Sequence, residues 1–138
     1  MSIVQTQTTS FKKELYTAVH NLSTDTIKIA LYTGNADLNE ATTVYSATNE
    51  VSGTGYTTGG QVMTGVAISS SGYVAYANWA NASWSGALTA RCALIYNASK
   101  GNKSIAVLDF GSDKTSTTTF TITMPANTST TALIRSSN

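Results

Sequence analysis

Charged side chains are scarce in this chain of 138 residues. Only 11% of the residues are Asp, Glu, Lys or Arg, and the net charge is +1, whereas soluble proteins average about 25% charged residues. Nucleic-acid binding depends on clustered Lys and Arg that release counterions from phosphate, and the one small cluster is Lys12-Lys13. We therefore expect no nucleic-acid partner. Serine and threonine, at about 30% of the chain, give it a neutral, hydroxyl-rich surface instead.

Cysteine and long apolar runs are also missing. The single Cys92 excludes an intrachain disulfide, so packing must hold the fold. Alternation places Cys92 beside Leu88 and Leu94, which predicts a buried, inert thiol. No run reaches the length of a membrane span, and the N-terminus lacks the basic and apolar regions of a signal peptide. We expect no membrane partner and synthesis in a cytoplasm.

Catalytic and metal-binding patterns do not appear. His20 is the only histidine and has no companion at the spacing of a zinc site or a triad, so we interpret it as a residue at a helix C-terminus. Asp37, Asn39 and Glu40 lack the spacing of a calcium loop. The serines include no Gly-x-Ser-x-Gly elbow, although distant carboxylates could still converge. The sequence predicts a protein that is not an enzyme and holds no metal or cofactor.

The stretch Val51 to Ile68 is the one around which the chain is organised. Gly53, Gly55, Gly59 and Gly60 in its first half predict a tight turn that uses positive φ. From Gln61 the period changes to that of a strand over 61–68. Val62, Val66 and Ile68 are expected on one side, and Met63, Gly65 and Ala67 on the other. Small residues there indicate that another sheet or another subunit lies close.

The rest of the chain predicts one β-rich domain over 10–138, preceded by a flexible N-terminal arm over 1–9. Ser10 is the expected cap of one helix that ends near Asn21. Further strands are expected over 25–34, 42–47, 73–79, 88–96, 103–110, 117–124 and 131–135. The fold class is thus all-β: an antiparallel β-sandwich, jelly-roll-like, or a small barrel, of eight to nine short strands with one N-terminal helix.

Two details of this arrangement are specific enough to test. The strands over 88–96 and 103–110 are apolar on both faces, which predicts a hairpin in the middle of a sheet, covered on both sides. If residues whose numbers sum to 200 stand opposite each other, Arg91 meets Asp109 in an ion pair.

The candidate interface residues come from two places. One set is the arm itself: Met1, Ser2, Ile3, Val4, Gln5, Thr6 and Gln7. The other set is Tyr56, Trp79 and Trp84, whose aromatic faces could stack on sugar rings. Aromatic side chains in so small a β-domain more often fill the core or a subunit interface, and we favour that interpretation.

Five stretches together resemble a family of small virion proteins encoded by tailed bacteriophages and prophages. They are Ser10 to Leu15, Asp25 to Thr33, Glu50 to Tyr56 with Gly59-Gly60, Arg91 to Asn97, and Ala106 to Ser112. The resemblance implies a structural protein of the virion and brings no active-site residues. Proteins of this size and character are similar to head decoration, or cement, proteins, which clamp neighbouring capsomers.

From this resemblance we expect a capsid decoration protein on the capsid surface of a virion, made in the bacterial host cytoplasm. Its expected partners are the major capsid protein and further copies of itself, as a dimer or trimer. One alternative is a host-recognition module of a head or tail fibre that binds glycan through Tyr56, Trp79 and Trp84. Another is a tail or neck component. Deleting residues 1–9 is expected to weaken particle binding and spare the fold.

Overall fold

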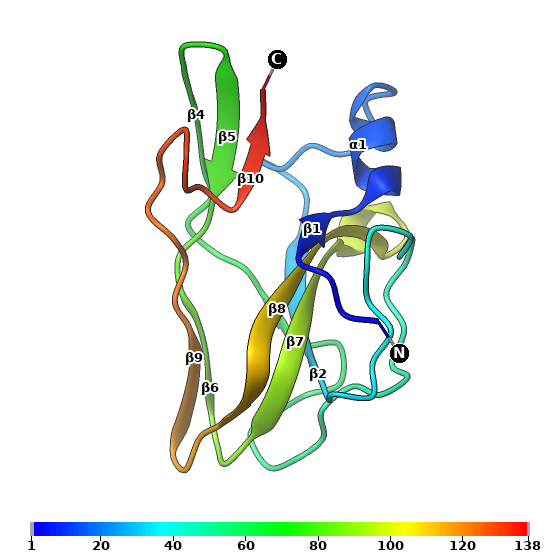
Figure 1. The fold of residues 1–138 in the computed structure, drawn as a ribbon, viewed down its shortest axis with the longest axis vertical. Helices are drawn as coiled ribbons and strands as arrows, with labels where there is room; N and C mark the ends of the chain where they lie inside the picture. Colours follow the sequence, from blue (N-terminus) through cyan, green and yellow to red (C-terminus); the bar gives the residue numbers. More distant parts are fainter. Residues whose placement is uncertain (1, 138) are drawn as a thin grey trace.

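The computed structural model describes residues 2–137, and within them the chain is mostly β, with ten strands in antiparallel sheets and one α-helix (Figure 1). The prediction of an all-β chain with one N-terminal helix is confirmed at this level. The strands number ten, where eight to nine were expected. Each of the three sheets in this part of the chain is open, so the small-barrel alternative is wrong.

The main sheet has the strand order β1-β8-β7-β2-β3. Its strands are β1 (Thr6–Gln7), β8 (Lys103–Thr115), β7 (Thr89–Asn97), β2 (Ile27–Tyr32) and β3 (Gln61–Val62). A short 3-10 turn, η1 (Ala98–Lys100), joins β7 to β8. The β7–β8 hairpin therefore occupies the middle of the sheet, as its two apolar faces predicted.

Two hydrophobic clusters cover the two faces of this sheet. Ile27, Ile29 and Leu31 of β2 belong to the larger cluster, and the alternate residues Ala30 and Tyr32 belong to the smaller one. Cys92 lies in the smaller cluster with no exposed surface, so the prediction of a buried thiol is confirmed. Burial raises the pKa of this thiol to about 11, which keeps it protonated and unreactive.

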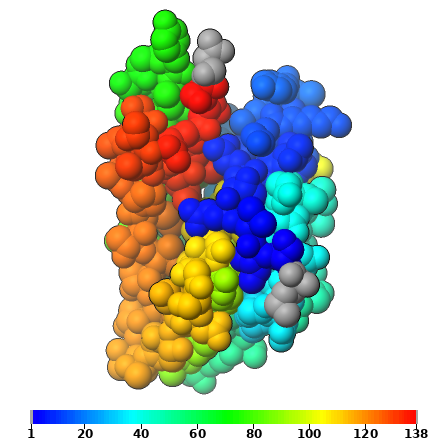
Figure 2. All heavy atoms as spheres, in the orientation of Figure 1, coloured from blue at the N-terminus to red at the C-terminus, as the bar shows by residue number. Residues whose placement is uncertain are grey.

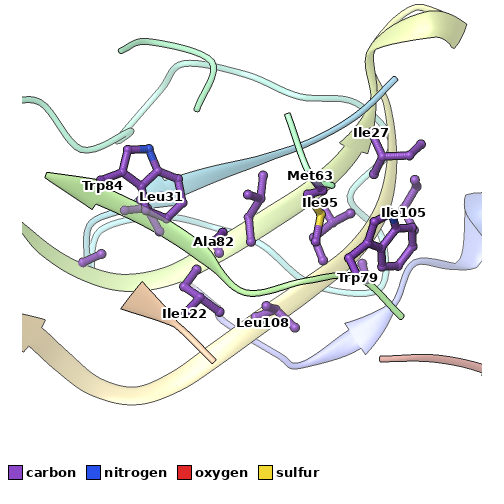
Figure 3. Packing of buried hydrophobic residues seen from close by; sticks show 14 of the residues in the cluster. Ile27, Leu31, Met63, Trp79, Ala82, Trp84, Ile95, Ile105, Leu108 and Ile122 are labelled. Carbon is purple, nitrogen blue, oxygen red and sulfur yellow. The ribbon is translucent and has the colours of Figure 1, made fainter. Parts of the chain in front are cut away.

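A two-stranded ribbon of β6 (Ala82–Ser85) and β9 (Thr119–Ile122) contributes to the larger cluster. Phe120 and Ile122 are buried, and the alternate residues Thr119 and Thr121 are exposed, in line with the alternation of this stretch. Figure 3 shows Trp84 and Trp79 at opposite ends of the labelled core, with Ile95 and Met63 between them.

A second ribbon has the order β10-β5-β4 and extends away from the main sheet at the upper left of Figure 1. It comprises β4 (Ala67–Ser71), β5 (Val74–Asn78) and β10 (Ile134–Ser136). The expected continuous strand over 61–68 is wrong, because Gly65 at φ +66° breaks it into β3 and β4. Val62 and Ile68, expected on the side opposite Met63, Gly65 and Ala67, are 49% and 55% exposed.

The register of β7 and β8 differs slightly from the expected one. Asn97 lies opposite Lys103, but a bulge shifts the pairing by one residue, and Cys92 rather than Arg91 lies opposite Asp109. Arg91 and Asp109 still form an ion pair. The hydrogen bond from Gly111 N–H lowers the pKa of the Asp109 carboxyl, and the Arg91 guanidinium lowers it further. Burial opposes both effects on this pKa.

The helix α1 (Thr9–Leu15) is shorter and earlier than expected. Thr8, not Ser10, is its N-cap, and its Oγ1 accepts a hydrogen bond from Phe11 N at 3.3 Å. The chain leaves the helix at Tyr16, and Ala18 adopts φ +58°. A non-glycine residue at positive φ cannot continue a right-handed helix, so the segment expected to be helical up to Asn21 turns back instead.

The N-terminal segment 2–8 lies on the main sheet instead of extending from it. β1 pairs with Val107 and Ala106 of β8, and Thr8 N donates to Ile105 O at 2.9 Å. Nearer the N-terminus, Val4 N donates to Leu38 O at 3.0 Å. The segment thus supplies an edge strand and the helix cap, neither of which its polar, unpatterned sequence indicated.

Candidate interaction surface

The most exposed ordered element of the described chain is the β4–β5 hairpin. All five residues of β4 are exposed, although the strand pairs with β5 along its full length. Tyr73 at the tip is 87% exposed and Ile68 within β4 is 55% exposed. The base of β5 is buried at Ala77 and Asn78 and pairs with β10, so the exposed part of the hairpin is β4 and the tip.

The hairpin forms for a local reason. Ser71 pairs with Val74, so the turn consists of the two residues Gly72 and Tyr73. Gly72 sits at φ +59° with open space around its Cα, and two-residue hairpin turns require such positive φ values. The strands expected over 61–68 and 73–79 left 69–72 for a hairpin turn; this is wrong, because Ser69, Ser70 and Ser71 belong to β4.

A groove separates this ribbon from the helix. Its volume is about 350 Å³; Phe11, Leu15 and Leu22 line one side, and Ile68 and Ile134 line the other. In Figure 2 the ribbon and the helix rise as separate lobes at the same end of the molecule. A further open hollow of about 540 Å³ lies between the end of β8 and β9, with Phe110, Lys114 and Phe120 in its lining.

The single histidine lies in a buried polar cluster behind the helix. His20 Nε2 lies 2.8 Å from Glu14 Oε1, and His20 Nδ1 lies 3.0 Å from Asn97 Nδ2. The same Asn97 amide group donates to Asp25 Oδ2 at 2.8 Å, while its Oδ1 accepts from Ser99 N. With the Asn97 amide oriented in this way, His20 Nδ1 accepts from Asn97 and Nε2–H donates to Glu14.

Asp25 anchors the other end of this cluster. Its carboxylate accepts from Asn97 Nδ2, from Asn21 N and from Lys100 Nζ at 3.0 Å. Burial by itself would raise the pKa of Asp25, but these hydrogen bonds and the Lys100 charge lower it to about 2. Through Glu14 and Asn97 this cluster joins the helix to the sheet. The His20 side chain has no exposed surface, so the imidazole is not accessible from solvent.

A second polar cluster holds the glycine-rich loop on the sheet. The carboxylate of Glu50 accepts from Tyr45 Oη and Tyr56 Oη, each at 2.5 Å, and from Gly59 N at 2.8 Å. Tyr56 Oη also accepts from Leu31 N of β2 at 2.9 Å. We call these groups the Glu50 clamp. Burial, followed by the nearby Glu50 carboxylate, raises the pKa of Tyr56 well above its usual value.

Two glycines of the loop allow this close approach. A Cβ on Gly60 would lie 1.8 Å from Ile29 O, and a Cβ on Gly55 would lie 1.8 Å from Ser85 O. Both residues also have positive φ. The prediction that the loop needs glycine for backbone conformation is confirmed, and contact with two different sheets is the additional reason that the sequence did not show.

The aromatic candidates for the interface do not form an exposed surface. Trp79 and Trp84 are each 5% exposed, and both belong to the larger core cluster. Tyr56 is half-buried, with its ring 5.9 Å from that of Trp84 and its hydroxyl in the Glu50 clamp. No stacking platform for a sugar ring is therefore presented by these three side chains.

The arm candidates lie together along the edge of the main sheet. Ser2, Val4 and Gln5 are exposed, whereas Ile3, Thr6 and Gln7 are half-buried; Met1 lies outside the described residues. Gln5 Oε1 accepts from Asp109 N at 3.0 Å and Gln7 Nε2 donates to Arg135 O at 2.8 Å. These contacts are within one chain.

Sequence reasoning missed the exposed hairpin and the Glu50 clamp. Ile68 and Tyr73 read as ordinary strand residues, and the only signal of exposure was the run of three serines between them. The clamp joins Tyr45, Glu50 and Gly59 within the one long connection between β2 and β3, and no recognisable spacing in the sequence brings them together.

Within residues 2–137, no group of three or more His, Cys, Asp or Glu side chains is arranged to hold a metal ion. No helix in this range is long and apolar enough to cross a membrane. Comparison with protein-family models, with curated proteins and with solved structures found no match.

Proposed function

We propose that this chain is a structural protein of a bacteriophage particle, and that it decorates the capsid by binding the major capsid protein. The observation that carries the proposal is strand β4, whose five residues are all exposed, in the hairpin that extends from the main sheet (Figure 1). Such an element suits a protein that works by contact with other chains. The resemblance of the sequence to small virion proteins gives the class of assembly.

The rest of the molecule supports a role based on shape. We propose that the main sheet and the β6–β9 ribbon act as the two layers of a sandwich, with the larger hydrophobic cluster between them. The Glu50 clamp and the Asp25 cluster tie the loops to this core. A rigid domain of this kind can make a modest contact that is repeated many times over a lattice, and repetition gives large total stabilisation.

The composition of particles made from the genome that encodes this chain tests the proposal. Quantitative mass spectrometry of purified particles should find on the order of hundreds of copies, and an electron cryomicroscopy map should place them on the capsid surface. Particles that lack the chain should release DNA at a lower temperature, and purified protein added back should restore the release temperature. A handful of copies per particle, or none, would contradict the proposal.

A further inference from the structure

The outer edge of β4 has none of the features that usually protect a strand edge. Within residues 2–137, β4 pairs with β5 alone, so its other edge has no strand partner. Its sequence, Ala67-Ile68-Ser69-Ser70-Ser71, contains no charge and no proline, and its pairing with β5 has no bulge. An edge of this kind is a template for a strand from another chain.

The other edges in the described chain are short, covered or charged. β1 and β3 contain two residues each, and β10 contains three, one of them Arg135. The edge of β6 is covered where Gln61 Nε2 donates to Ser83 O at 2.6 Å. β9 faces Lys114 across the open hollow beside β8. The edge of β4 is thus the one most open to strand pairing.

The charge distribution identifies the partner that suits this edge. From Val51 to Ala90 the sequence contains no Asp, Glu, Lys, Arg or His, although a stretch of this length would usually contain about ten charged residues. Both hairpin strands lie inside this stretch. A partner with charged groups would lose their hydration and find no counter-charge here, whereas an identical neutral edge brings no such cost. We propose that β4 of one copy pairs antiparallel with β4 of a second copy, about a two-fold axis.

The hairpin geometry and pairing along all five residues of β4 together define the register. Ser71 and Val74 close a two-residue turn, and such closing pairs are hydrogen-bonded to each other. Because the pattern alternates along a strand, Ile68 and Ser70 direct their backbone N–H and C=O groups outward. Pairing through these groups places Ser69 on the two-fold axis and Ile68 opposite Ser70 of the other copy.

The resulting dimer gives the open backbone edge of β4 a strand partner. Two three-stranded ribbons join into one sheet of six strands, which is more stable than either ribbon alone. In the same register the exposed Tyr73 at the hairpin tip comes close to Gly65 of the other copy. The two-fold symmetry closes the assembly at two chains, so the open edge does not lead to fibres.

Charge substitution on the axis is the first test. We expect the purified wild-type chain to be a dimer by sedimentation equilibrium at concentrations between about 1 μM and 1 mM. Ser69→Lys and Ser69→Glu each place like charges opposite one another and should weaken the dimer about tenfold or more. Mixing the two variants should restore dimers as a Lys–Glu hetero-pair. A wild-type monomer, or a dimer unchanged in both variants, would overturn the proposal.

Cysteine cross-linking tests the register with a matched control. The Cα atoms of two Ser69 residues across the axis would lie about 4.5 Å apart, within the range that a disulfide spans. The two Ser71 residues, one from each copy, would be offset by four residues and so lie more than about 13 Å apart along the strand direction. Under mild oxidation Ser69→Cys should give a covalent dimer and Ser71→Cys should not, and the native Cys92 is buried. Equal cross-linking of both variants would overturn the register.

These measurements are independent of the proposed viral role. They use purified protein without capsids, so a dimer could be found in a protein that is absent from particles. Conversely, a wild-type monomer that still saturates capsids would overturn the β4 dimer and leave the decoration role intact.

Discussion

The glycine-rich loop over 50–60 and the β4–β5 hairpin are neighbours in the sequence and opposites in structure. The loop is held by the Glu50 clamp and lies so close to β2 and β6 that two of its glycines admit no Cβ. The hairpin has open space at Gly72, and every residue of β4 is exposed. Both segments are rich in glycine and hydroxyl groups, so composition does not distinguish a fixed loop from a free one; what distinguishes them is the contact that each backbone makes.

Substitution of glycine in each region should give the largest difference. Gly60→Ala adds a Cβ that would lie 1.8 Å from Ile29 O, at φ +79°, so the loop must move off the sheet and we expect a loss of at least about 3 kcal/mol in the free energy of unfolding. Gly72→Ala adds only the strain of φ +59°, about 1–2 kcal/mol. Urea unfolding of both variants measures the difference, and equal losses would show that the loop is not fixed by its close approach.

Removal of one hydroxyl from each region should have the next largest effect. Tyr56→Phe leaves Leu31 N without its partner and removes one of the two hydrogen bonds to Glu50 Oε2, which keeps the bond from Gly59 N. An unsatisfied buried donor costs about 1–3 kcal/mol, and a lost hydrogen bond to a charged group costs a similar amount. We therefore expect a loss of about 2–3 kcal/mol. Tyr73→Phe removes a hydroxyl from a side chain that is 87% exposed and should change the free energy of unfolding by less than about 0.5 kcal/mol. A small loss in Tyr56→Phe would mean that the clamp does not hold the loop.

The sequence was informative where side chains alternate and uninformative where backbones meet. The period of two in Ile27, Ile29 and Leu31 predicts that these side chains share one face of β2, where they join the larger cluster, and the two apolar faces of β7 and β8 predict their central place. The period alone did not reveal the break at Gly65, because a glycine fits a strand and a kink equally well. The exposure of Ile68 followed from that break, and so did the error in the hairpin turn.

The N-terminal segment was unpredictable for a related reason. β1 is a strand because Thr6 and Gln7 pair with β8, not because their side chains alternate between core and solvent. Likewise, Thr8 caps the helix instead of Ser10, and both are good capping residues. The Glu50 clamp depends on how the long connection between β2 and β3 folds back on itself, which no local pattern records.

Acid should lower the free energy of unfolding through Asp25, whereas the hairpin contains no carboxylate that could respond. The pKa of Asp25 is lowered from 3.8 to about 2, so its stabilising contribution is complete above about pH 3.8 and is lost as the pH falls toward 2. A shift of this size corresponds to about 2 kcal/mol. The free energy of unfolding should fall by this amount between about pH 4 and pH 2, and Asp25→Asn should flatten the decline. Asp113→Asn, in an exposed part of β8, is the matched control and should leave the decline unchanged.

Loss of a single methylene from each region should give the smallest difference. Ile29 has no exposed surface and packs in the larger core cluster, so Ile29→Val should cost about 0.5–1.5 kcal/mol. Ile68 is 55% exposed, and its δ-methyl has few neighbours to lose, so Ile68→Val should change the free energy of unfolding by less than about 0.5 kcal/mol. Thermal unfolding of both variants at equal protein concentration measures the contrast. A cost at Ile68 equal to that at Ile29 would mean that the hairpin face is covered in solution, and its dependence on protein concentration would then show whether a second copy covers it.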